Sequence, residues 1–296
     1  METKILSGKT ASDSVYKSLK PRISILKNKD ITPGLAVILV GNDIPSKLYV
    51  TGKTKKFQTL GLYSQTFNFS GDASQESILE KISELNRNSD FHGILVQLPL
   101  PPQINPETVL ESINPLKDVD GFHPWNLGKL CTGNPQFIPC TPKGVMRIME
   151  FYNIDPAGKH VVVVGRSNIV GRPLSILMSL KSSSANSTVT LCHSGTKNIS
   201  IFTLSADIIV LALGKPEFLR GDQIKKGAVV LDVGINRVSD NSEKGYYITG
   251  DAHMESLLGQ ASAVTPVPFG LGPMTIAMLV ENTIEAAENY IEKSRD

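Results

Sequence analysis

The sequence predicts an α/β protein with two domains, each built around a mainly parallel sheet. Strand-like apolar runs alternate with segments of helical periodicity along most of the 296 residues, and this alternation is typical of βαβ units. The alternation starts again after Pro142, and a chain of this length can bury two separate cores. One apolar run passes directly into a glycine-bounded turn after Val164, which is a common link between a strand and the helix that follows it.

The first half of the chain is predicted to contain three strands and four helices. The strands are predicted near residues 34–40, 63–69 and 93–98. The helices have a periodicity of 3.6 residues and lie near residues 10–27, 45–60, 75–88 and 105–113. Helices therefore lie between and around the strands, as parallel pairing requires.

The second half is predicted to open with a helix near residues 143–153. Five strands follow, near residues 160–164, 187–192, 207–212, 228–233 and 262–265. From Gly272 to Lys293 the apolar residues recur at helical spacing, which predicts one long amphipathic helix. The length of this helix suggests that it returns to the first domain and braces it.

Composition and charge exclude several classes of protein. A net charge of +2 with 20% charged residues gives no reason to expect a nucleic acid partner. The three cysteines show no C-x-x-C spacing, so neither a disulfide framework nor a metal site is expected. The N-terminal residues lack the apolar stretch typical of a secretory leader, so none is expected, and no apolar run approaches the roughly 20 residues that cross a bilayer. We therefore expect a soluble cytoplasmic protein with no membrane partner.

The turn after Val164 has the features of a phosphate-binding turn. Gly165 allows a tight turn, and Gly171 allows the next helix to pack closely on the strand. The amides at the start of that helix present partial positive charge to a diphosphate, which indicates a dinucleotide. The pattern is G-x-S-x-x-x-G, without the usual three glycines, so an ordinary turn between strand and helix is the alternative.

The end of the next predicted strand bears on the choice of dinucleotide. Proteins that bind NAD usually place a carboxylate there, on the ribose hydroxyls. Here Cys192 is followed by His193 and Ser194, with no acidic residue. Together with Arg166 in the turn, Ser194 favours NADP over NAD, although a solvated surface arginine is the alternative.

A first polar cluster lies in the helix predicted near residues 45–60. Tyr49 and Lys53 are four residues apart and therefore share one face of the helix, with Ser46 a further turn back. A lysine beside a phenol ring and an apolar wall is a candidate acid or base near neutral pH. A core tyrosine with an exposed lysine is the alternative.

Two further clusters follow the strand predicted near residues 93–98. Gln97 lies at its carboxyl end, where ligands of open α/β sheets bind. A buried amide there needs a hydrogen-bond partner, and a nearby lysine is a plausible one. The later loop that contains Asp118, Asp120 and Phe122 would suit a planar heterocycle with amino groups. The two aspartates could instead cap turns.

Six segments of the chain, taken together, resemble the signatures of the bifunctional methylenetetrahydrofolate dehydrogenase/methenyltetrahydrofolate cyclohydrolase (FolD) family. They occur in the family's order and cover nearly the whole chain. They are Tyr49-Val50-Thr51-Gly52-Lys53, Gln97-Leu98-Pro99-Leu100-Pro101, Lys117-Asp118-Val119-Asp120-Gly121-Phe122, Pro139-Cys140-Thr141-Pro142-Lys143-Gly144, Gly165-Arg166-Ser167 through Pro173, and Gly272-Pro273-Met274-Thr275.

The resemblance implies an activity and a fold. The activity is NADP-dependent oxidation of 5,10-methylenetetrahydrofolate, followed by hydrolysis of the methenyl product to 10-formyltetrahydrofolate. The implied fold has a folate-binding domain of residues 1–141 with the helix 272–296, a Rossmann NADP-binding domain of residues 142–271, and a cleft between them. A homodimer paired through the Rossmann domains and a place in one-carbon metabolism and purine biosynthesis are also implied.

The resemblance also implies roles for particular residues. Lys53 is the central catalytic lysine, Gln97 tunes it through a hydrogen bond, Tyr49 contacts the benzoyl ring of the folate, and Asp120 binds the pterin. The substrate-binding residues are these four with Leu98, Pro268 and Gly272. The cofactor-binding residues are Gly165, Arg166, Ser167, Ile169, Val170, Gly171, Pro173, His193, Ser194 and Thr275.

This chain departs from the family pattern at two places. Phe269 and Leu271 replace the small residues that commonly follow Thr-Pro-Val-Pro, and a phenyl ring there is a candidate for narrowing the folate pocket. The residues after Gly250-Asp251 also differ, and we expect that difference to face solvent without assigning a role to His253. Two rival functions are a shikimate-type NADP dehydrogenase and a non-catalytic dinucleotide sensor.

Overall fold

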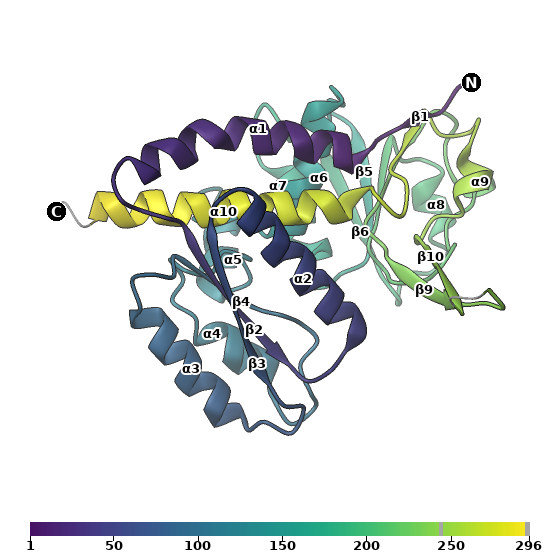
Figure 1. Cartoon of the computed structure of the whole chain (residues 1–296). Coiled ribbons are helices and arrows are strands. Elements are labelled where there is room, and N and C mark those ends of the chain that lie inside the picture. Colours follow the sequence, from purple (N-terminus) through teal and green to yellow (C-terminus); the bar gives the residue numbers. More distant parts are fainter. Residues whose placement is uncertain (243–244, 294–296) are drawn as a thin grey trace. The chain divides into compact units, whose positions relative to one another are not determined.

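The computed structural model describes residues 1–242 and 245–293, with side chains described as far as residue 291. The chain divides into two compact units. The six-stranded unit consists of Met1–Val15 with Thr141–Ala277, and the three-stranded unit consists of Tyr16–Cys140 with Met278–Asp296. The prediction of an α/β protein with two parallel sheets is confirmed (Figure 1).

The three-stranded unit contains a parallel sheet in the order β3-β2-β4. Its strands are β2 (Gly34–Val40), β3 (Tyr63–Phe69) and β4 (Gly93–Val96). All seven residues of the central strand β2 are buried, because a parallel sheet is covered on both faces. The first two strands have the predicted bounds, and β4 ends two residues earlier than predicted.

The helices that accompany this sheet are close to those predicted. They are α1 (Gly8–Lys27), α2 (Ile44–Thr59), α3 (Gln75–Arg87), α4 (Pro106–Glu111) and the long α10 (Leu271–Lys293), whose residues from Met278 belong to this unit. Side chains of Asp43, Ser74 and Asn105 accept amide hydrogens at the starts of α2, α3 and α4. A further helix, α5 (Pro124–Cys131), was not predicted, although proline at its first position is a start signal.

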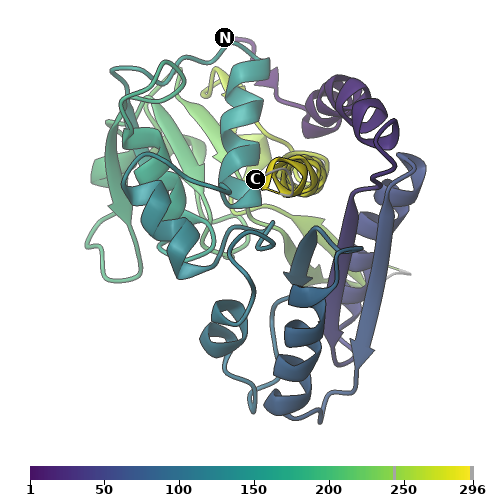
Figure 2. The same cartoon turned by 90° about the vertical axis from the view of Figure 1, so that its left-hand side faces the viewer.

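Two helices of this unit, α3 and α4, form a hydrophobic core with one face of the sheet (Figure 2). Ile78, Ile82 and Leu85 of α3 pack on alternate residues of β2 and β4, together with Val109 of α4. Alternation of side chains along a strand leaves the opposite residues for the other face. There α2 contacts β2 and β3.

Within the three-stranded unit, α1 and α10 run side by side (Figures 1 and 2). Arg22 on α1 donates from Nε to Oε1 of Glu288 at 2.9 Å and from Nη2 to Oε2 at 2.5 Å. A second carboxylate, Glu281, has an oxygen 3.9 Å from the same guanidinium. These contacts raise the pKa of Arg22 and tie the C-terminal helix to the unit that contains β2.

The six-stranded unit has a parallel sheet in the order β1-β11-β8-β7-β5-β6. Its strands are β1 (Lys4–Ile5), β5 (His160–Val164), β6 (Thr188–Cys192), β7 (Ile208–Leu211), β8 (Val229–Asp232) and β11 (Ala263–Val264). All five strands predicted for the second half are present. The two-residue β1 is too short to produce a periodic signal and was not predicted.

The remaining elements of this unit include short pieces that the sequence pattern did not predict. The expected first helix is α6 (Cys140–Phe151), and the helix after the glycine-bounded turn is α7 (Gly171–Ser179). The unpredicted elements are α8 (Ser200–Thr203), a 3₁₀ turn (Gly221–Gln223), α9 (Met254–Leu257) and the antiparallel pair of β9 (Asn236–Ser239) and β10 (Tyr246–Thr249). Four-residue elements are shorter than the window in which periodicity is measurable.

The strand order of the larger sheet creates one position for a ligand. β5 pairs with β6 on one side and with β7 on the other, so the chain leaves β5 in one direction and later returns to its other side. At such a switch point the loops after neighbouring strands diverge and leave a crevice at the carboxyl ends. The glycine-bounded turn follows β5 directly.

We predict that Ile82→Ala destabilises the protein by about 2–5 kcal/mol, because Ile82 is 0% exposed in the α3 core and its truncation leaves a cavity. Urea denaturation followed by circular dichroism measures the change. Ile25→Ala is the matched control, since Ile25 is 55% exposed on α1. An equal loss of stability in the two variants would contradict this account of the core.

Candidate functional site

The candidate site of the three-stranded unit is built on helix α2. Asp43 accepts hydrogen bonds from the amide (2.9 Å) and the hydroxyl (2.6 Å) of Ser46 and thereby starts the helix. The buried residues of α2 recur every three or four positions: Ser46, Val50, Lys53 and Phe57. Lys53 therefore occupies a position on the apolar stripe that faces the sheet, and it is only 4% exposed.

The ammonium of Lys53 meets two of the predicted partners. Its Nζ donates to Oε1 of Gln97 at 3.1 Å and lies 4.3 Å from the centre of the Tyr49 ring. Gln97 follows the last residue of β4, and its Nε2 donates to the carbonyl of Leu98 at 2.8 Å. That second bond fixes the orientation of the amide, so that its oxygen faces the lysine. The expected partnership of the amide with a lysine is present.

Burial and the charge of a nearby residue shift the pKa of Lys53 in opposite directions. Burial lowers the pKa of Lys53, and the nearby carboxylate of Asp120 partly offsets this by favouring the ammonium. The pKa of Asp120 is raised by burial, against the opposing effects of Lys53 and of a hydrogen bond from Cys140. Lys53, which is buried, and Asp120, which is half-buried, therefore form an interacting acid–base pair.

The two aspartates of the same loop have different surroundings. Asp118 accepts hydrogen bonds from the amide of His123 at 2.8 Å, from the amide of Phe122 at 3.2 Å and from Nδ2 of Asn126 at 2.7 Å. It therefore organises the loop, which agrees with the turn-capping alternative. Asp120 is the aspartate that interacts with Lys53.

Sequence reasoning missed two residues that support this cluster. Asn282 of α10 is 0% exposed and donates from Nδ2 to the carbonyls of Val119 (2.8 Å) and Ile138 (3.1 Å). Cys140 donates from Sγ to the carbonyl of Val119 at 3.3 Å. Both therefore fix the backbone next to Asp120. An asparagine among the apolar residues of the last helix was the available signal.

The six-stranded unit has a candidate site of its own, at the carboxyl ends of β5, β6 and β7. A cavity of about 480 Å³ is present there. Five predicted residues line it: Gly165, Arg166, Ser167, His193 and Ser194. The lining residues that were not predicted include Thr196, Ile199, Leu213, Lys215 and Phe218. The loop after β7 contributes several of these, and its place follows from strand order, which the sequence alone did not reveal.

The other predicted cofactor residues do not line this cavity. Gly171 and Pro173 are buried in the first turn of α7, and Ile169 and Val170 are half-buried in the turn before it. Thr275 lies on α10, where its hydroxyl is 3.2 Å from that of Thr141. These residues shape the surroundings of the cavity or lie apart from it.

Two glycines of the turn have no room for a side chain. Gly165 has a φ of +129°, and a Cβ there would lie 2.1 Å from the carbonyl oxygen of Ala212. A Cβ on Gly171 would lie 1.8 Å from the carbonyl oxygen of Gly165. The hydroxyl of Ser167 accepts from the amides of Val170 (3.2 Å) and Gly171 (3.4 Å). The turn is thus closed tightly on itself, so the start of α7 packs against the turn backbone.

The wall of the cavity formed by the β7 loop is held by a buried carboxylate. Asp251 is 0% exposed and accepts from the amides of Leu213 (2.8 Å), Gly214 (3.0 Å) and Lys215 (2.9 Å). Behind it, burial raises the pKa of Asp232 to about 7, although backbone amides oppose the shift. Asp251 therefore holds the loop after β7 in the conformation that places Lys215 in the lining of the cavity.

The expectation that residues after Asp251 face solvent was wrong. Ala252 is buried in the core of the unit and donates its amide to Asp232 at 2.8 Å. His253 is half-buried and starts α9 by accepting from the amide of Ser256 at 3.3 Å. Because the segment also holds the β7 loop, it is part of the internal structure of the unit.

The segment before α10 contains Phe269, one of the two residues at which this chain departs from the family pattern, and the other, Leu271, begins the helix. Phe269 has a φ of +77° and its side chain is 64% exposed, while its carbonyl accepts from the amide of Gly8 at 2.9 Å. Leu271 is buried. The predicted substrate residues Pro268 and Gly272 lie in this segment, in the six-stranded unit, whereas Lys53, Gln97 and Asp120 are in the other.

Two further features of the described residues bear on function. None of their helices combines the length and apolar character that crossing a membrane requires. Among the same residues, no group of three or more histidine, cysteine or acidic side chains is arranged to hold a metal ion.

Family comparison gives two matches that together span most of the chain. Residues 6–120 match the catalytic domain of tetrahydrofolate dehydrogenase/cyclohydrolase, and residues 139–291 match its NAD(P)-binding domain. This chain belongs to the tetrahydrofolate dehydrogenase/cyclohydrolase family. The resemblance drawn from the six segments is therefore confirmed.

Individual members of the family are similar over almost their whole length. The bifunctional protein FolD of Acetivibrio thermocellus is 50% identical over 97% of this chain and 98% of that protein. The bifunctional enzyme FolD of Campylobacter jejuni is a solved structure with a TM-score of 0.91 and 44% identity, covering 97% of this chain and 99% of that one. The Trypanosoma brucei FolD structure, complexed with NADP and an inhibitor, has a TM-score of 0.93, 34% identity and coverage of 98% and 99%.

The shikimate-type alternative has a much weaker similarity. Shikimate 5-dehydrogenase of Thermus thermophilus gives a TM-score of 0.51 at 13% identity, with coverage of 86% of this chain and 99% of that one. This level of similarity shows a shared fold only. The tetrahydrofolate dehydrogenase/cyclohydrolase family therefore accounts for the chain, and the shikimate type does not.

We predict that Gly171→Ala weakens NADP binding by roughly tenfold or more, because the new Cβ would displace the backbone of Gly165 and deform the turn. Isothermal titration calorimetry with NADP measures the loss. Gly128→Ala is the matched control, since no atom lies within 4 Å of a Cβ built there. Unchanged affinity in folded Gly171→Ala would contradict the proposed role of the turn.

Proposed function

We propose that this protein oxidises 5,10-methylenetetrahydrofolate with NADP and then hydrolyses the methenyl product to 10-formyltetrahydrofolate. The observation that carries the proposal is the buried Lys53, hydrogen-bonded to Gln97 and electrostatically coupled to Asp120. A protein that only sensed dinucleotides would have no need for a proton-transfer group of this kind. Membership of a family described by both activities supports the same conclusion.

The cavity in the six-stranded unit fits NADP in the charge of its lining. Arg166 and Lys215 supply positive charge, Ser194 and Thr196 supply hydroxyls, and no aspartate or glutamate is among the described lining residues. A carboxylate would repel a 2′-phosphate, so its absence favours NADP over NAD. The tight turn at Gly165 lets backbone approach a diphosphate closely. NADP supplies the acceptor for the hydride of the substrate.

The oxidation needs little acid–base chemistry from the protein. Loss of hydride from the carbon between N5 and N10 leaves a cation that is delocalised over both nitrogens. No proton is transferred in this step, so the protein contributes mainly by orienting the substrate. We propose that Tyr49 contacts the benzoyl ring and that Asp120 binds the amino groups of the pterin. Leu98, Pro268 and Gly272 are proposed as further substrate contacts, and Thr275 as a cofactor contact.

The hydrolysis requires proton transfer, which we assign to Lys53. Water adds to the methenyl carbon and loses a proton, and one carbon–nitrogen bond then breaks as that nitrogen gains a proton. Burial favours the neutral amine of Lys53, and the positive charge of the methenyl substrate would lower its pKa further. The amine then accepts the proton from water, while Gln97 holds it in place through the 3.1 Å hydrogen bond.

Several broader properties follow from family membership as proposals. We propose that the protein acts in the cytoplasm, in the one-carbon supply for purine biosynthesis, and that it forms a homodimer through the Rossmann domain. We also propose that residues 1–141 with the helix 272–296 bind folate and that residues 142–271 bind NADP. The compact units differ from this division mainly at Met1–Val15, which belong to the six-stranded unit.

The proposal is tested with purified protein, methylenetetrahydrofolate and either NADP or NAD. Absorbance of the reduced nucleotide and of the methenyl product is followed together. Reduced NADP without lasting methenyl absorbance is the expected result. Accumulation of the methenyl product would refute efficient hydrolysis, and no reduction of either nucleotide would refute the dehydrogenase assignment.

We predict that Lys53→Met lowers the hydrolysis rate by about 10²–10⁴-fold, the usual contribution of a general acid or base, while some hydride transfer remains. Single-turnover measurements of each step on the two substrates separate the effects. Lys47→Met, at an exposed lysine of the same helix, is the control. Equal loss of both steps would overturn the division of roles.

A further inference from the structure

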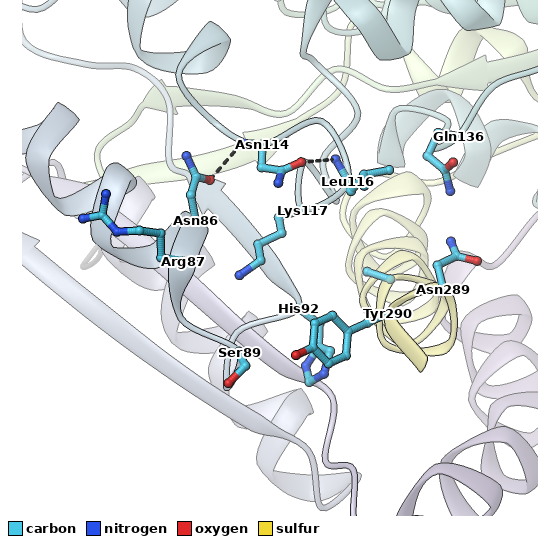
Figure 3. A pocket seen from close by; sticks show the side chains of 11 residues that line it. Asn86, Arg87, Ser89, His92, Asn114, Leu116, Lys117, Gln136, Asn289 and Tyr290 are labelled. Carbon is cyan, nitrogen blue, oxygen red and sulfur yellow. Dashed lines mark hydrogen bonds between the residues drawn. The ribbon is translucent and has the colours of Figure 1, made fainter. Parts of the chain in front are cut away.

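The three-stranded unit contains a second cavity, distinct from the cluster around Lys53. It has a volume of about 450 Å³, which is within the range of small-molecule sites. Its lining comes from the end of α3, the residue before β4, the loop before Asp118 and the last turns of α10 (Figure 3). His92 and Gln97 stand at opposite ends of β4, so about 16 Å of strand separates the two places.

Hydrogen-bond donors without acceptors face this cavity. The Nδ1 atom of His92 accepts from the amide of Gly34 at 3.1 Å, and burial lowers the pKa of His92 to about 4. The ring is therefore neutral at physiological pH and carries its proton on Nε2. Among the described residues, no hydrogen-bond acceptor for this Nε2–H is present.

Lys117 and Asn114 add to the donors. The ammonium of Lys117 donates to the carbonyls of Leu85 (3.0 Å) and Asn88 (2.7 Å), which leaves one of its three N–H groups unused within the described part of the chain. The side-chain oxygen of Asn114 accepts from the amide of Leu116 at 2.9 Å, so its NH₂ group is the end that is left for a ligand. Figure 3 shows the Lys117 side chain extending into the space between Arg87 and Tyr290.

The charge and shape of the lining complement these donors. Arg87 and Lys117 are cationic, and no described aspartate or glutamate lines the cavity. The phenol ring of Tyr290 meets the ring of His92 edge to face, with 5.6 Å between centroids, and Leu116 and Ala286 extend the apolar wall. A ligand binds more tightly here if it has a negatively charged group with several hydrogen-bond acceptor atoms and a flat apolar ring.

We propose that this cavity binds a small planar aromatic carboxylate, at a site separate from those for folate and NADP. The carboxylate accepts from Lys117 and His92 Nε2, and the ring packs beside Tyr290. Arg87, whose guanidinium donates to Ser83 at 3.1 Å, adds positive charge at the rim. The site uses no residue assigned above to catalysis, so its occupancy and the enzyme's turnover are measurable independently.

The test uses benzoate as the probe, with the full chain saturated with NADP. Calorimetry is expected to detect benzoate binding, with weaker binding of neutral benzamide and of non-planar cyclohexanecarboxylate. In a ¹H–¹⁵N spectrum the Nε2–H signal of His92 is expected to shift on binding. Tetrahydrofolate is expected not to displace the probe.

Two variants locate the binding. Arg87→Glu, at an exposed position of the rim, is expected to weaken benzoate binding roughly tenfold or more, because it replaces a positive charge near the carboxylate by a negative one. His92→Asn keeps an acceptor for Gly34 and removes the Nε2–H, and is expected to weaken binding as well. Lys29→Glu makes the same change of charge at an exposed residue outside the lining and should leave binding unchanged.

Dehydrogenase turnover is expected to remain unchanged in Arg87→Glu. The proposal is overturned by three results: no benzoate binding, equal binding by wild type and Arg87→Glu, or displacement of benzoate by tetrahydrofolate. A loss of turnover in Lys53→Met with benzoate binding retained would support it, since the two sites would then be independent.

Discussion

The arrangement of the catalytic residues depends on the burial of one ammonium group. Lys53 occupies a stripe of α2 that otherwise packs against the sheet, and removing its charge from water is unfavourable. Gln97, Tyr49 and Asp120 compensate from three different segments. Each of these segments must therefore be placed accurately, and the rest of the unit supplies that placement. Asp118 shapes the loop that follows Asp120, and Asn282 fixes the backbone just before Asp120.

In the six-stranded unit, contacts of backbone groups hold the loops around the cavity in place. Its cavity is bounded by loops, and loops are held only where their amides and carbonyls have partners. Gly165 and Gly171 allow the turn to close on itself. Asp251 gathers three successive amides of the β7 loop. The geometry of the cavity is thus fixed before any ligand binds, which lowers the entropy lost on binding.

The sequence predicted the long elements and the main chemical groups because both leave local signals. Strands β2 and β5 contain continuous apolar runs, and the spacing of Tyr49 and Lys53 determines that they share a helix face. Strand order, the contribution of the β7 loop and the support from Asn282 depend on contacts between distant residues, which periodicity does not encode. The segment after Asp251 was misjudged for this reason, since a buried loop and a surface loop have similar composition.

The position of Lys53 on a packing stripe has a consequence for the evolution of this chain. A methionine or leucine at this position would fill the same space without the penalty of a buried charge. Selection for thermal stability alone would therefore favour replacing the lysine, and only selection for activity opposes that change. A homologue that is no longer selected for enzymatic activity is expected to lose this lysine early while keeping the fold. Replacement of the lysine would therefore identify family members that have lost the activity.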